Sequence, residues 1–119
     1  MEALNALAPR MRQGGVLLGH KRGHRFIVEN LLPTPGGLDP RPAFLARLDE
    51  LFGGRAIGLF GSGGAARLKT ALRQPAAAGR MLLCVRFGKS GPRFEAWAVD
   101  FDGRFRFVPL PLILEDDRP

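Results

Sequence analysis

The middle of this sequence is most informative for what it lacks. Between Leu51 and Phe94 there is no aspartate, glutamate or histidine, so this stretch offers no carboxylate or imidazole for acid–base catalysis or metal binding. The chain has no tyrosine and one tryptophan, Trp97, which weakens any case for a surface that stacks nucleic-acid bases. The single cysteine, Cys84, cannot form an intramolecular disulfide. Its apolar surroundings in the sequence are typical of a small buried hydrophobe.

Long apolar segments are also missing. No uninterrupted run approaches the ~20 residues that a membrane-spanning helix needs. The run 1–8 has Leu4 and Leu7 at helical spacing, but Pro9 ends it before the apolar core of a signal peptide could form. We therefore expect a cytoplasmic protein that does not contact a membrane.

Size and composition are those of an ordinary globular protein. The chain has 119 residues, of which 45% are hydrophobic and 24% are charged. A chain of this length buries roughly two-thirds of its surface on folding and needs no metal or disulfide to do so. We expect a single domain over residues 1–119, with short flexible ends at about 1–10 and 115–119.

Positive charge exceeds negative charge. Lys and Arg number 18 against 11 Asp and Glu, which gives a net charge of +7. The stretch without acids contains Arg55, Arg67, Lys69, Arg73, Arg80, Arg86, Lys89 and Arg93. Such an excess attracts nucleic acid or acidic proteins, although the same residues can simply face water and keep a protein soluble.

The hydrophobic pattern predicts an α+β domain, a mixed sheet of about six strands packed with two to three helices. Strands are expected over residues 15–19, 25–32, 56–60, 81–87, 94–101 and 104–112. Helices are expected over 1–8, over 42–52 with Phe44, Leu45, Leu48 and Leu51 on one face, and over 65–72 with Leu68 and Leu72 inward. Glycine and proline predict a linker over 88–92.

Three segments carry a family resemblance through their order. The strand GVLLG at 15–19 is followed by an apolar strand ending at Pro33, then by a helix, and then by the run IGLFGSGG at 57–64. This arrangement resembles JAB/MPN (JAMM) metalloisopeptidases, whose third strand leads into an H-S-H-P motif. The resemblance covers about residues 11–114. It implies a JAB/MPN-like fold, which is cytidine-deaminase-like.

The sequence differs from that family at the positions of the general base and the zinc ligands. Active members use a glutamate as general base, yet Arg12 or Gln13 stands near its place. Gly61 and Gly63 take the places of the two zinc-binding histidines, and no acid stands near the place of the zinc-binding aspartate. The resemblance thus implies a site without zinc or another cofactor. Its vestigial frame is Gly61, Ser62, Gly63, Gly64 and Gln74.

We therefore expect a catalytically inactive JAB/MPN-like domain rather than an enzyme. The resemblance implies a protein–protein interaction or scaffold module that contacts an unknown protein partner or a second copy of itself.

The alternative is a basic protein that binds nucleic acid or another anion through the glycine-rich loop and the cationic helix after it. Gly61 to Ala66 fits G-x-G-x-x-A between a strand and a helix, and free N–H groups at a helix start can hold phosphate or carboxylate. The contacts would come from Arg67, Lys69 and Arg73. A full dinucleotide fingerprint lacks its acidic residue about 20 positions on, and a Walker loop would need lysine at Gly64. A plain helix turn explains the same residues.

Two further patterns favour ordinary structure over function. The run GRFRFV at 103–108 faintly resembles the RNA-stacking signature of RRM domains. Its period of two predicts Phe105 and Phe107 in the core, with Arg104 and Arg106 facing water. His20 and His24 would face each other across the first hairpin if its loop had three residues. The cations around that turn argue against a metal there.

Overall fold

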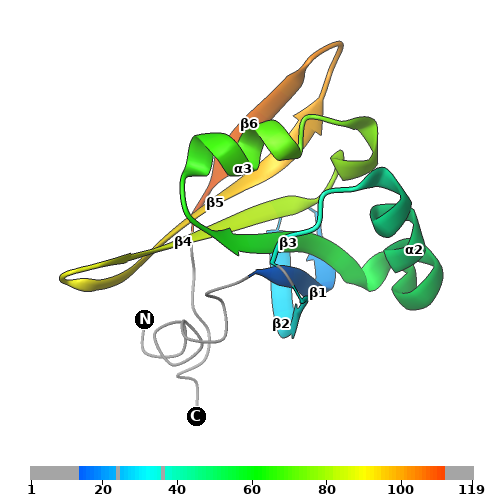
Figure 1. Cartoon of the computed structure of the whole chain (residues 1–119). Coiled ribbons are helices and arrows are strands. Elements are labelled where there is room, and N and C mark those ends of the chain that lie inside the picture. The colour runs from blue at the N-terminus through cyan, green and yellow to red at the C-terminus, as the bar shows by residue number, and fades with distance from the viewer. Residues whose placement is uncertain (1–13, 24, 36, 112–119) are drawn as a thin grey trace.

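The computed structural model describes residues 14–23, 25–35 and 37–111, which form an α+β domain (Figure 1). Its strands are β1 (Gly15–Arg22), β2 (Arg25–Pro33), β3 (Ala56–Ser62), β4 (Met81–Gly88), β5 (Gly91–Phe101) and β6 (Phe105–Leu110). The described helices are α2 (Pro42–Phe52) and α3 (Ala65–Ala71), with short 3-10 turns η2 (Gly53–Arg55) and η3 (Pro75–Ala77). This agrees with the expected class, a mixed sheet of six strands with two helices. None of the described helices is long and apolar enough to cross a membrane.

The six strands form one mixed sheet in the order β2-β1-β3-β4-β5-β6. All neighbours are antiparallel except β3 and β4, which run parallel and are connected through α3. Parallel strands need such a crossover connection, whereas hairpins join β1 to β2, β4 to β5, and β5 to β6. The carboxyl ends of β3 and β4 therefore lie side by side near the start of α3, and β2 and β6 form opposite edges of the sheet.

Both helices pack on the same face of the sheet. Their buried leucines, Leu45 and Leu48 of α2 and Leu68 of α3, join Leu59 and Leu82 of the central strands in one apolar cluster. A second cluster occupies the other face, and no residue of a described helix belongs to it. Its buried members are Leu17, Ile57, Phe60, Met81, Leu83, Val85 and Ala96. Burial on both faces explains why β3 and β4 are continuous apolar runs in the sequence.

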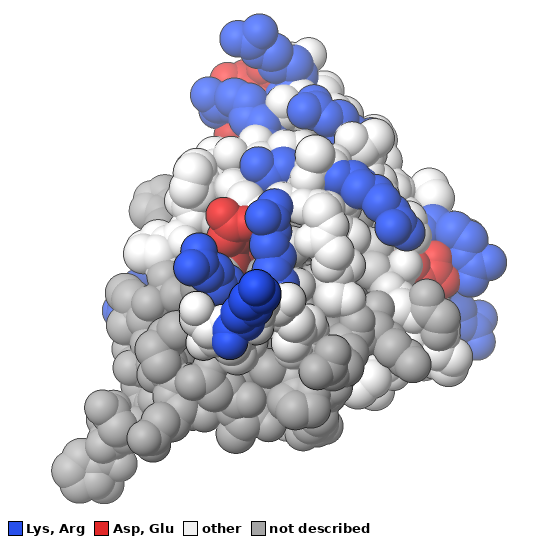
Figure 2. Space-filling model, turned by 60° about the vertical axis from the view of Figure 1, so that its left-hand side comes forward, with Lys and Arg blue, Asp and Glu red and all other residues white. Residues whose placement is uncertain are grey.

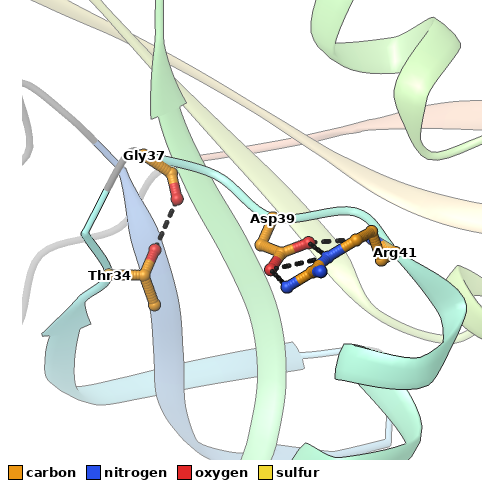
Figure 3. Close-up of polar contacts among 4 residues, drawn as sticks. All are labelled: Thr34, Gly37, Asp39 and Arg41. Atoms are coloured by element: carbon orange, nitrogen blue, oxygen red, sulfur yellow. Dashed lines mark hydrogen bonds and ion pairs between the residues drawn. The ribbon is translucent and has the colours of Figure 1, made fainter.

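The chain enters α2 through a hydrogen-bonded loop (Figure 3). Thr34 Oγ1 donates to the carbonyl oxygen of Gly37, and the Asp39 carboxylate accepts from the backbone N–H of Arg41 at 3.1 Å. The Arg41 guanidinium also donates to Asp39, at 2.9 Å from Nε and 2.7 Å from Nη2. These hydrogen bonds hold the pKa of Asp39 below its usual value. Pro42 then begins the helix, where its missing N–H costs nothing.

A buried arginine joins α2 to the sheet. Arg80 is only 8% exposed, and its guanidinium donates to the carbonyl oxygens of Ala56, Leu45 and Ala76. It also forms an ion pair with Asp49 of α2, with Nη2 at 2.9 Å from Oδ1. Arg80 belongs to the part of the sequence that has no acidic residue. Its ion-pair partner, Asp49, comes from α2, so Arg80 stabilises the fold.

The structure corrects several expected boundaries. The segment 88–92 is mostly strand rather than linker, because Gly91 adopts a positive φ of 106° and closes the β4–β5 hairpin through the two-residue turn Lys89–Ser90. In the first hairpin, β1 extends to Arg22. Leu51 was expected on the inner face of α2 and is instead 64% exposed. The helix expected over 1–8 and the expected flexible ends lie outside the described residues.

Candidate functional site

The glycine loop links β3 to α3 at the carboxyl ends of the two parallel strands. Gly63 has a φ of 112°, which side chains disfavour, and a Cβ atom at Gly63 would meet nothing within 4 Å. Gly61 is different, because a Cβ atom there would lie 3.3 Å from side-chain atoms of Leu38 and Leu68. Apolar side chains thus fill the space beside Gly61, the position that the family resemblance assigns to a zinc ligand.

Gln74 does not join the glycine loop. It follows the C-terminal end of α3, and a seven-residue helix is about 10 Å long, so Gln74 and the loop lie at opposite ends of α3. Its Nε2 donates to the carbonyl oxygens of Pro40 and Ala71, and its Oε1 is buried with no hydrogen-bond partner in the described structure. Arg12 and Gln13, expected near the place of the general base, lie outside the described residues.

Cys84 lies directly behind the loop. It pairs with Gly61 across β3 and β4, and its Sγ lies 3.4 Å from the carbonyl oxygen of Gly63. Burial is the main cause that raises the pKa of the Cys84 thiol, while the charge of Arg86 lowers it and the charge of Glu95 raises it. A thiol with a raised pKa stays protonated near neutral pH and is a poor nucleophile. The expectation that Cys84 is a buried hydrophobe is confirmed.

The three candidate cations of the helix do not form one cluster. Lys69 places its Nζ 4.1 Å from the ring centroid of Trp97, and Arg73 places its Cζ 5.4 Å from that of Phe107. Lys69 lies on the side of α3 that faces β5 and β6, and Arg73, two residues after the end of α3, lies over the Phe107 ring that Lys69 also approaches. Arg67 precedes Lys69 by two residues, which is about 200° around the helix axis, so it points elsewhere.

A further group of cations lies on the β4–β5 hairpin, which projects beyond the body of the domain (Figure 1). Arg86 and Arg93 are directly opposite each other across the two strands, and Lys89 occupies the turn. All three are exposed. Lys69 covers Trp97 of β5, which lies on the same strand and the same face as Arg93, so Lys69 borders the hairpin cations. The sequence listed these residues, but it did not show that they share a surface.

We call this group the hairpin–helix surface and define it as Lys69, Arg73, Arg86, Lys89 and Arg93. Within residues 14–23, 25–35 and 37–111, none of the five forms an ion pair with a carboxylate. Glu95 is an acidic residue close to them. Its charge raises the pKa of the Cys84 thiol, whereas the charge of Arg86 lowers it. Figure 2, turned toward the hairpin side, shows more Lys and Arg than Asp and Glu on this face, and the acidic groups that are visible lie among the cations.

The last hairpin agrees with its expected pattern. Phe105 and Phe107 are half-buried and pack against the helix-side core, whereas Arg104 and Arg106 are exposed. Arg106 also pairs with Asp100 at 2.7 Å. The two phenylalanines therefore belong to the core and do not form an open stacking platform.

The histidine pair has no support as a metal site. The β1–β2 turn is tighter than a three-residue loop, because Arg22 pairs with Arg25, and His20 is opposite Ile27. His20 Nδ1 lies 3.7 Å from Glu29, and His24 lies outside the described residues. In the described part of the chain, no three His, Cys, Asp or Glu side chains gather in a way that could hold a metal ion.

Comparison with protein-family models, curated proteins and solved structures finds no match for this chain. Its function is therefore inferred from its own residues and geometry.

Proposed function

We propose that this chain is a catalytically inactive JAB/MPN-like domain that acts as a protein–protein interaction or scaffold module. Support comes from the order β1, β2, α2, β3, glycine loop, which is the order of elements on which the resemblance rests. The two positions of the histidine ligands are Gly61 and Gly63, and neither glycine can bind zinc.

The geometry of the loop agrees with loss of catalysis. A side chain at position 61 would begin 3.3 Å from the side chains of Leu38 and Leu68, so these leucines would have to shift to admit it. The nearest thiol, Cys84, is buried with a raised pKa, because burial penalises the thiolate. The described loop thus supplies neither metal ligands nor an activated nucleophile.

The observation that carries a binding role is the outer strand β2. It is nine residues long, its only charged residues are Arg25 and Glu29, and Val28 and Leu32 are 40% and 38% exposed. It forms an edge of the sheet, and a long edge strand with exposed apolar side chains is a template for pairing with another strand. We place the protein contact along this edge.

Affinity capture with paired variants tests this role. The double variant Val28→Lys with Leu32→Lys puts two charges on the edge, which blocks strand pairing. Leu51→Lys is the matched control, because Leu51 is exposed on α2, away from that edge. We expect one protein, or a second copy of this chain, to be captured by the wild type and by the control after nuclease treatment, and to be lost with the double variant.

Light scattering on the same proteins identifies the self-association case. Capture that does not differ between the double variant and the control would remove the edge from the proposal. Stoichiometric zinc in the purified, untagged protein would overturn the assignment as an inactive domain.

A further inference from the structure

We propose that the hairpin–helix surface binds the phosphate backbone of a nucleic acid. This inference goes beyond the protein contact proposed at β2 and does not depend on it. The two surfaces are separate, since β1 and β3 lie between β2 and the β4–β5 hairpin in the sheet.

The first argument is the repulsion that the hairpin retains. Arg86 and Arg93 are a directly opposed pair, so their Cβ atoms are about 4.5–5.5 Å apart, and like charges in that position destabilise a hairpin. Glu95 is opposite Cys84 on the same face and forms no ion pair with either arginine in the described structure. A phosphate between the two guanidiniums would relieve the repulsion and accept charge-assisted hydrogen bonds from both.

The second argument is the shape of the charged surface. The cations run from Lys89 at the tip of the hairpin, past Arg86 and Arg93, to Lys69 above Trp97. Six residues of extended strand separate Gly91, which follows the Lys89–Ser90 turn, from Trp97, which is about 20 Å at 3.3 Å per residue. A single small anion would use one point of this row. A polymer with a phosphate at every nucleotide can use its whole length.

The third argument selects the nucleic-acid backbone over bases or an acidic protein. Trp97 is buried and lies under Lys69, and the ring of Phe107 has both Lys69 and Arg73 over it, so neither ring is open to a base. Phe87 has an exposed ring on the hairpin, but it lies on the opposite face of the sheet from Arg86, because successive side chains on a strand point to opposite faces. Protein interfaces need desolvated aromatic or apolar anchors, which this surface does not present. We expect phosphate contacts with little sequence preference.

Fluorescence anisotropy with charge-matched variants tests the proposal. The hairpin variant combines Arg86→Gln, Lys89→Gln and Arg93→Gln. The control variant combines Arg22→Gln, Arg47→Gln and Arg55→Gln, which removes the same charge from exposed residues elsewhere. The probes are labelled single-stranded DNA, duplex DNA and RNA of about 20 nucleotides, at about 50 mM salt. Trp97 emission and thermal melting verify that each variant is folded.

We expect the wild type to bind at least one of the three probes, which identifies the form of nucleic acid. The hairpin variant should bind that probe about tenfold more weakly or worse, and the control should stay within about threefold of the wild type. The Val28→Lys, Leu32→Lys protein should bind like the wild type, so this result is independent of the β2 proposal. Absence of binding at low salt, equal losses in both variants, or equally tight binding of polyglutamate would overturn the inference.

Discussion

Arg80 and the pair Arg86 and Arg93 come from the same stretch of sequence without acidic residues. In the structure, however, their environments are opposite. Arg80 is buried and donates to three carbonyl oxygens and to Asp49. Arg86 and Arg93 are exposed, face each other, and form no ion pair in the described structure. Absence of acids along the chain therefore does not mean absence of acids in space.

The difference separates cations that hold the fold from cations that are available to a partner. Asp49 is 31 residues from Arg80 in the sequence, and α2 brings the two together. No element brings an acid into an ion pair with the hairpin arginines within the described residues. The hairpin thus presents two directly opposed, exposed arginines without an ion pair among the described residues.

The largest effect is expected at Arg80. Arg80→Ala should lower the free energy of unfolding by about 2–4 kcal/mol, because buried carbonyl oxygens, including that of Ala56, lose their donor. Chemical denaturation monitored by Trp97 emission measures it. Asp49→Asn is the control and should cost less, since Asp49 is 58% exposed and the carbonyl contacts remain. An unchanged unfolding midpoint for Arg80→Ala would contradict the structural role of this arginine.

A smaller loss of stability is expected at Lys69. This residue packs over a ring of the core and also borders the hairpin cations. Lys69→Met keeps the length of the side chain but removes the cation over Trp97, so it should cost about 0.5–1 kcal/mol. The emission of Trp97 should change in the folded state. Arg67→Met, on another side of α3, should leave both unchanged. If the two variants behave alike, the contact between Lys69 and Trp97 contributes nothing.

Arg93→Glu is expected to change stability in the opposite direction. It replaces a repulsive pair with an attractive one opposite Arg86, which should stabilise the protein by about 0.5 kcal/mol. The same variant should weaken binding to nucleic acid. A thermal melt and an anisotropy titration on one sample measure both. A fall in stability would show that Arg93 has a structural role, as Arg80 does.

The smallest effect is expected at the exposed ion pair between Asp39 and Arg41. Hydrogen bonds from Arg41 lower the pKa of Asp39 in the folded state. The carboxylate therefore contributes stability above its unfolded pKa, and this stability is lost as the pH falls through the lower folded pKa. Asp39→Asn should lower the melting temperature slightly at about pH 7 and not at about pH 2. A difference that persists in acid would show that the charge is not its cause.

Much of the fold follows from local sequence. The bounds of α2 were predicted from its apolar spacing and Pro42, and the runs that became β3 and β4 were recognised as strands. Partners distant in sequence were not predictable, because nothing near Arg80 in the chain identifies Asp49. The link between β4 and β5 was predicted at the right place but too long, since Gly91 and Pro92 indicate a break unless the pairing of the strands is known.

The candidate site was predictable only in part. The separation of Arg67 from Lys69 follows from helical periodicity and could have been predicted from the sequence. The position of Lys69 over Trp97 could not, because it depends on how α3 crosses the sheet. The family resemblance and the inactive assignment stay predictions until the β2 and zinc experiments are done.

The salt dependence of nucleic-acid binding tests the central claim most directly. If Arg86, Lys89 and Arg93 contact phosphates, replacing all three with glutamine should make the slope of log K against log salt concentration shallower by about 2–3, at roughly 0.7–0.9 per lost contact. The Arg22, Arg47 and Arg55 control should keep the slope of the wild type. Equal slopes for the wild type and the hairpin variant would contradict the claim that these cations bind a partner.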